Sequence, residues 1–164
     1  MSSFDPTESR INATCRRWPG FPREPAVLVR LIKGLYKSVH DHANAVLRDF
    51  DLCHGEYNVL MMLYGTPDRL LGPSELAGAA TEKSANITRL TDLLCRKGLI
   101  ERIPHAEDRR KLELRLTPEG VACVESVLPR MSELLLTEMK GLDGAEQHQL
   151  EGLLKKMLDG IDTI

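Results

Sequence analysis

The sequence predicts a mainly α-helical fold of the α+β class, in which a pair of short helices and a β-hairpin stand between long helices. Two observations predict it. Apolar residues recur at helical spacing from 81 to 97 and stop at Gly98, and a strictly alternating segment, 112–116, follows a charged turn. The first pattern is typical of an amphipathic helix and the second of a half-buried strand. This order predicts a winged helix-turn-helix.

The first part of the chain predicts an arm and two helices. Residues 1–24 contain three prolines and scattered arginines, so we expect an irregular or partly helical arm. From 25 to about 50, apolar residues at three- and four-residue intervals predict one long amphipathic helix. A shorter helix is expected over 56–64, and the segment 65–68 ends it.

The helix pair at the centre has its own start and stop signals. Pro73 suits the first position of a short helix, because its fixed φ and missing N–H cost nothing there, and Glu75 falls in the first turn. This helix is expected to end near Ala80. Thr81 can cap the next helix, and Gly98 can end it. The hairpin strands are expected at 100–103 and 112–116.

The last third predicts two further helices. Thr117 and Pro118 begin one that continues to about 140, with Pro129 expected to kink it, and the last helix covers 145–160. Long helices outside so small a module carry more apolar surface than a monomer of this size covers. We therefore expect a twofold homodimer. The predicted domains are an N-terminal arm (1–24), a helical dimerisation region (25–55 and 117–164) and a winged helix-turn-helix lobe (56–116).

Composition excludes several classes of protein. The chain has 164 residues, 42% hydrophobic and 28% charged, which is ordinary for a soluble globular protein. No apolar run approaches the roughly 20 residues that span a bilayer, and the first residues carry acids rather than a secretory signal. We expect a cytoplasmic protein without membrane contact, whose four widely spaced cysteines are reduced thiols.

Charge is distributed unevenly along the chain. Between Lys83 and Arg115 there are nine Lys or Arg and five Asp or Glu, a net charge of +4, whereas the whole chain carries −2. A protein polarised in this way has one face suited to a polyanion. We expect this face to bind double-stranded DNA, and a homodimer with two reading helices suits a palindromic operator.

The expected DNA contacts lie on the second helix of the pair and on the hairpin tip. Arg89 can bind guanine through two hydrogen bonds, Ala85 can contact a thymine methyl group, and small polar side chains can reach bases or phosphates. An arginine at the hairpin tip can enter a narrow minor groove. The candidate DNA-binding residues are Ser74, Ser84, Ala85, Asn86, Thr88, Arg89, Asp108, Arg109 and Arg110.

Five blocks of sequence resemble the MarR family of bacterial transcriptional regulators, in that family's order and spacing. They are PSELA (73–77), NITR (86–89), KGLIER (97–102), DRR (108–110) and LRLTPEG (114–120), and the segment around 127–129 resembles the multidrug-efflux repressor branch. The resemblance implies a homodimeric winged-helix protein, usually a repressor, that releases DNA when a small aromatic or anionic effector binds. It places Arg89 on the recognition helix, and Asp108 with Arg109 on the wing.

Candidate effector-binding residues come from two sources. Aromatic and methionine side chains on elements that should border the cleft between lobes would suit a planar phenolic ligand. The resemblance adds a urate-responding branch that uses an N-terminal Trp, an Asp and two Arg, although Ile103 stands at one of the Arg positions. The candidates are Trp18, Tyr36, His40, Tyr57, Met61, Asp68 and Arg115.

Three alternatives compete with this interpretation of the sequence. A winged-helix module that docks a protein partner would usually lack arginines on the recognition helix and wing. A redox-sensing regulator of the same fold would use Cys53 or Cys15. A metal site at His40, His42, Cys53 and His54 is disfavoured, because residues two apart point in different directions on a helix. No catalytic motif and no cofactor-binding pattern is present, so we expect neither an enzyme nor a cofactor or metal.

Overall fold

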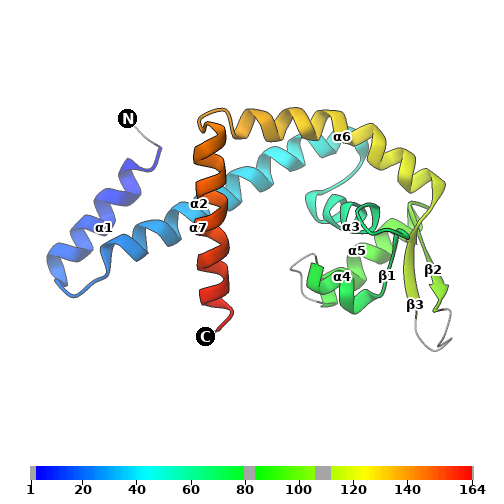
Figure 1. The fold of residues 1–164 in the computed structure, drawn as a ribbon, viewed down its shortest axis with the longest axis horizontal. Coiled ribbons are helices and arrows are strands. Elements are labelled where there is room, and N and C mark those ends of the chain that lie inside the picture. The colour runs from blue at the N-terminus through cyan, green and yellow to red at the C-terminus, as the bar shows by residue number, and fades with distance from the viewer. Residues whose placement is uncertain (1–2, 80–83, 106–111, 164) are drawn as a thin grey trace. The chain divides into compact units, whose positions relative to one another are not determined.

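The computed structural model describes residues 3–79, 84–105 and 112–163, and its contacts divide the chain into two units, 1–45 and 46–164. Helices dominate the described residues, together with a small three-stranded antiparallel sheet (Figure 1), which confirms the predicted α+β class. The elements are α1 (Asp5–Arg17), α2 (Arg23–Leu47), a 3-10 turn (Arg48–Phe50), α3 (His54–Tyr64), β1 (Leu70–Leu71), α4 (Pro73–Ala79), α5 (Ser84–Arg96), β2 (Ile100–Pro104), β3 (Leu112–Leu116), α6 (Pro118–Glu138) and α7 (Gly144–Ile161).

The first unit is more regular than the sequence indicated. Most of the expected arm forms α1, which has a proline in its first turn and acidic residues near its start, both of which favour helix initiation. Ile11 of α1 is buried. The guanidinium of Arg23 at the start of α2 donates hydrogen bonds to Asn12 Oδ1 at 2.7 Å and Glu8 Oε1 at 2.5 Å, so α1 is tied to α2.

The second unit contains the lobe that the sequence predicted. In Figure 1, α3, α4, α5 and the sheet lie together, and α6 continues directly from β3. The core of this lobe is built from aliphatic side chains of α3, α4, α5 and β3. Its fully buried members are Val59, Leu60, Leu63, Leu76, Ile87, Leu90, Leu94 and Leu114.

The sheet has the order β1-β3-β2, with both pairings antiparallel. The hairpin was expected, whereas β1 was not, because two residues leave too short a pattern to recognise. In this register Arg115 lies opposite Leu70 on one side and opposite Glu101 on the other. β1 therefore anchors the base of the hairpin to the loop that follows α3.

Two glycines explain how the hairpin joins its neighbours. Gly98 follows α5 with φ of +70°, a left-handed conformation that glycine adopts at little cost. It ends α5, the expected DNA-reading helix, as predicted. A Cβ atom on Gly120 would lie 2.0 Å from the carbonyl oxygen of Leu99. The first turn of α6 therefore packs directly against the backbone that enters β2, and this approach requires glycine.

The long C-terminal helices begin where the sequence predicted. Thr117 accepts a hydrogen bond from the Gly120 amide at 3.0 Å and caps α6, which includes Pro129 within its length. Asp143 and Glu146 form a capping box at the start of α7. The two helices and the residue that follows α6 leave large apolar side chains exposed, namely Leu135, Leu136, Met139, Leu150, Leu153, Leu154, Leu158 and Ile161. Within the described residues, no helix has the length and apolar content to cross a bilayer.

Candidate nucleic-acid interface

Helix α5 has one buried face and one exposed face. Ile87, Leu90 and Leu94 are buried in the lobe, as their spacing predicted. Ser84, Ala85, Thr88 and Arg89 are exposed on the other face. Small polar side chains and one arginine on an exposed, rigidly packed helix can approach base edges closely.

Arg89 is held in a defined orientation by its own helix. Its Nη2 and Nε atoms donate to Asn86 Oδ1 at 3.0 and 3.3 Å. Two hydrogen bonds from one guanidinium to the same oxygen restrict the rotamers of the arginine side chain. Of the predicted DNA-binding residues, Asn86 and Arg89 are thus brought together by the structure.

Helix α5 is joined to the hairpin through Thr91 and Asp92. The carboxylate of Asp92 accepts a hydrogen bond from Arg102 of β2 at 2.5 Å. Arg102 also donates to the hydroxyl of Thr91 at 3.2 Å. The hydrogen bond to Asp92, together with its charge, raises the pKa of Arg102 despite partial burial.

The hairpin tip is described only at its two ends. Nε2 of His105 lies 3.7 Å from Glu113 Oε1 across the hairpin. The predicted wing contacts Asp108, Arg109 and Arg110, and the expected helix cap Thr81, lie outside the described residues. Their roles stay predictions.

Ser74 lies exposed in the first turn of α4, beside a backbone amide that already has a partner. The Glu75 carboxylate accepts a hydrogen bond from the Gly72 amide at 2.9 Å. A phosphate approaching Ser74 would therefore meet this carboxylate, which weakens the expected contact because like charges repel.

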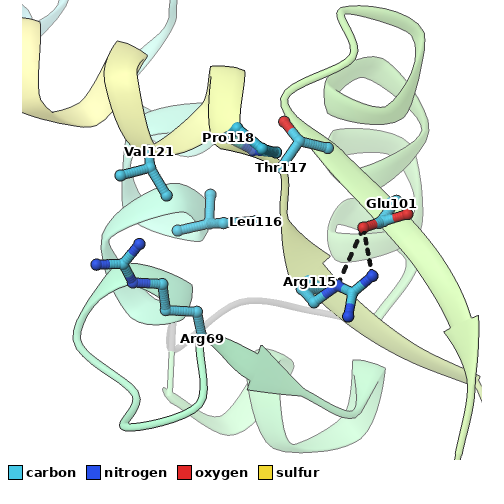
Figure 2. Close-up of a pocket in the computed structure, with 7 residues that line it drawn as sticks. All are labelled: Arg69, Glu101, Arg115, Leu116, Thr117, Pro118 and Val121. Carbon is cyan, nitrogen blue, oxygen red and sulfur yellow. Dashed lines mark hydrogen bonds and ion pairs between the residues drawn. The ribbon is translucent and has the colours of Figure 1, made fainter.

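A cavity of about 540 Å³ lies at the base of the hairpin, where β3 passes into α6. In Figure 2 the guanidinium groups of Arg69 and Arg115 lie on either side of Leu116, and Arg115 is turned toward Glu101. Arg115 donates to Glu101 Oε1 at 2.8 and 3.0 Å. Thr117, Pro118 and Val121 complete the lining. The cavity therefore combines two guanidinium groups and the carboxylate of Glu101, which is paired with Arg115, with an apolar wall.

Arg69 was not predicted as a site residue. It adopts φ of +54°, an uncommon conformation for a residue with a side chain, and its guanidinium lies 5.3 Å from the centre of the Tyr64 ring. The carbonyl of Arg69 accepts a hydrogen bond from the Leu116 amide at 3.4 Å. Sequence alone gave no signal for Arg69, because a left-handed arginine is recognisable only once the turn is seen.

The other predicted effector-binding residues are spread over both units. Trp18, 70% exposed, belongs to the first unit, where the rings of Tyr36 and His40 stack at 6.0 Å. In the second unit, Tyr57 is buried, and this burial raises the pKa of its hydroxyl. Met61 is half-buried, and Asp68 is exposed in the turn that precedes Arg69. Arg115 alone of these candidates lines the cavity at the hairpin base.

The cysteines divide by burial. Cys95 and Cys123 are half-buried, and burial raises the pKa of both thiols. A raised pKa disfavours the reactive thiolate. Cys53 is exposed at the start of α3, where its side chain takes part in a capping box with Glu56. Among the described residues, no group of three or more His, Cys, Asp or Glu is arranged to hold a metal ion.

Comparison with known proteins relates the whole chain to DNA-binding regulators. Residues 52–112 match the MarR family. The transcriptional repressor MprA of Escherichia coli (strain K12) is 30% identical over 163 residues, which cover 99% of this chain and 93% of MprA. Each of these matches includes the helix pair and the start of the wing.

Two solved complexes with DNA share the fold. A crystal structure of a MarR variant from E. coli with operator DNA has a TM-score of 0.74 at 30% identity and covers 80% of this chain and 93% of that one. The MepR–DNA complex from S. aureus has a TM-score of 0.75 at 26% identity and covers 80% and 96%. The winged helix-turn-helix prediction is confirmed, and the chain belongs to the MarR family of DNA-binding transcriptional regulators.

Proposed function

We propose that this regulator is a repressor that binds a palindromic operator as a homodimer, with α5 of each protomer in the major groove. The observation that carries the proposal is the exposed polar face of α5, on which Asn86 fixes Arg89 above a fully buried inner face. A reading helix whose side chains are oriented before binding loses less conformational freedom on the DNA. The role is one of binding rather than catalysis, and it belongs in the cytoplasm, where bacterial DNA lies.

The dimer is formed by the long terminal helices. Exposed apolar side chains on α7, among them Leu153, Leu154 and Leu158, follow helical spacing and form a stripe that one protomer leaves uncovered. Covering such a stripe with a second copy of the chain removes apolar surface from water. A twofold dimer then presents two copies of α5, whose separation must match about one turn of DNA, roughly 34 Å.

The effector binds at the base of the hairpin, in the cavity between Arg69 and Arg115. A small aromatic acid suits this cavity, because its carboxylate can pair with a guanidinium while its ring covers Leu116 and Val121. Asp68 precedes Arg69 in the chain but is not among the residues that line this cavity. A ligand here lies where the hairpin, β1 and α6 meet, so it can shift the hairpin and the separation of the reading helices.

Selection of bound duplexes from a random-sequence pool tests the proposed function. We expect wild-type protein to enrich a palindrome at low salt. Arg89→Ala should weaken binding to that palindrome by about 1–3 kcal/mol and relax the preference at one position in each half-site. Arg48→Ala, at an exposed position outside α5 and the hairpin, is the matched control and should bind like wild type. A protein that enriches no sequence, yet captures one protein partner in a fixed ratio, would be an interaction module instead.

A further inference from the structure

Arg102 joins the hairpin to the reading helix. Its guanidinium lies 2.5 Å from Asp92 Oδ1 and 3.2 Å from the Thr91 hydroxyl. Both partners belong to α5, and Arg102 belongs to β2. A charged donor that bridges two acceptors on one helix restrains both the distance and the rotation between helix and strand.

The Thr91 end of this contact is buried. Thr91 is 3% exposed, and its hydroxyl donates to the carbonyl of Thr88 at 3.0 Å while it accepts from Arg102. The hydroxyl therefore both donates and accepts a hydrogen bond. Loss of Arg102 would leave a buried oxygen with an unused acceptor position, which carries a free-energy cost. The bridge is thus part of the packing between α5 and β2 as well as a surface ion pair.

The acid in the bridge, Asp92, stands in the segment 83–115, which carries a net charge of +4. Asp92 lies on the helix that reads DNA, where a free carboxylate would repel phosphates. Pairing with Arg102 neutralises this charge. A second acceptor for the same guanidinium, from DNA, would have to compete with a 2.5 Å charged contact.

We propose that Arg102 is a positioning residue for operator binding, which holds the hairpin at a fixed orientation to α5 through Asp92 and Thr91. This inference rests on the proposed function. The hairpin and α5 can bind adjacent grooves together only if their relative orientation is set, and setting it before binding lowers the entropic cost of the complex. Arg102 acts through Asp92 and Thr91 and does not itself contact DNA.

Asp92→Asn separates this role from simple electrostatics. Removal of a negative charge from a DNA-binding face should strengthen binding if only net charge matters. If Asp92 holds Arg102 in place, the same change weakens operator binding, by about five- to tenfold. Arg102→Gln should weaken it to a similar extent. The double variant should bind no worse than either single one, because both changes remove the same ion pair.

The experiment measures operator affinity by fluorescence anisotropy at several salt concentrations, with the selected duplex as the probe. We expect the slope of log affinity against log salt to be the same for wild type and Arg102→Gln. Arg130→Gln is the matched control, because Arg130 forms an equally short pair with Asp49, at 2.5 Å, outside the α5–hairpin contact. It should bind like wild type, and circular dichroism melts identify any variant that is unfolded.

Three results would overturn the inference. One is Asp92→Asn binding as tightly as wild type or more tightly. Another is a salt slope for Arg102→Gln that is smaller by about 0.9, which is the loss of one phosphate contact. The third is additive losses in the double variant. Wild-type protein that binds no duplex at all would instead refute the proposed function, so the two failures are distinguishable.

Discussion

Nζ of Lys97 lies 2.9 Å from Oε1 of Glu56, a residue that is 4% exposed. Lys97 follows the end of α5, and Glu56 stands in the first turn of α3, where its other oxygen accepts a hydrogen bond from the Cys53 amide at 2.9 Å. Lys97 also contacts the backbone carbonyl of Asp51. One ion pair thus connects the end of the reading helix to the cap of α3 and to the turn before it.

Replacement of Lys97 by Met should destabilise the fold. The carboxylate of Glu56 would remain buried without its cation, and we expect the free energy of unfolding to fall by about 1–3 kcal/mol. Urea denaturation at pH 8 measures the change. Lys140→Met removes a lysine from an exposed position outside the helices and should stay within about 0.5 kcal/mol of wild type. Equal stabilities for all three proteins would contradict the role of the ion pair.

The same ion pair predicts a pH dependence at high pH. Burial acts to lower the pKa of Lys97, but the hydrogen bonds and charges of Glu56 and Asp51 together outweigh it, so the pKa is raised. A raised pKa stabilises the fold fully below the unfolded-state value, about 10.4, and this stabilisation is lost as the pH rises through the folded-state value. We expect the stability difference between wild type and Lys97→Met to shrink above about pH 10.4. A difference that stays constant from pH 8 into that range would refute this assignment.

Gly120→Ala tests the close approach of α6 to the hairpin. Its new Cβ would lie 2.0 Å from the Leu99 carbonyl oxygen, so backbone has to move. We expect a loss of about 1–3 kcal/mol in the free energy of unfolding, as for other overpacked sites. Gly78→Ala, at an exposed position of α4 with nothing within 4 Å of the new Cβ, should instead be neutral or slightly stabilising. Similar melting temperatures for Gly120→Ala and wild type would show that the approach is looser.

Local signals were sufficient to predict most of the lobe. The Thr117 cap, the left-handed Gly98 and the apolar spacing of α5 are each encoded within a few residues, and the structure has them where they were expected. Helix bounds differ by a few residues, because helix ends depend on neighbours as much as on the local sequence. The helix α1 was expected only in part, since three prolines within 1–24 obscure its periodicity.

Relationships between distant residues could not be predicted. The strand β1 forms because Leu70 and Leu71 pair with β3. It could not be predicted, because two residues are too few to show a periodic pattern. The contact of Arg102 with Asp92 and the left-handed turn at Arg69 likewise arise from tertiary packing. The exposed face of α5 was therefore predictable from the sequence. The bridge from Arg102 to Asp92, which joins α5 to the hairpin, was not.

The dimer predicts a specific effect of charge on α7. Leu154→Glu places a carboxylate within the exposed apolar stripe, and the twofold axis places it there twice. We expect the dimer to be weakened by about 3 kcal/mol or more, from lost apolar burial alone. Light scattering after gel filtration measures the mass. Gln149→Glu adds the same charge at an exposed polar position of the same helix, and its mass should remain that of a dimer.

The proposed effector cavity predicts a variant that binds DNA but needs more effector for its release. Arg69→Gln removes one of the two guanidinium groups that line the cavity and leaves α5 untouched. We expect unchanged operator affinity, together with an approximately tenfold higher concentration of a benzoate derivative needed for release, about 1.4 kcal/mol of lost interaction. Thermal-shift screening of benzoate derivatives on wild type selects the probe. If Arg48→Gln loses the response equally, the cavity is not the effector site.

The salt dependence of operator binding tests the central claim most directly. Wild-type protein should bind its selected palindrome at 50 mM salt, with an affinity that falls by on the order of 10³ or more by 200 mM as phosphate contacts are screened. Arg89→Ala should lose discrimination between this palindrome and a duplex changed at the contacted base, while it keeps the steep salt slope. Absence of binding at 50 mM, or an Arg89→Ala variant that discriminates as well as wild type, would contradict the account.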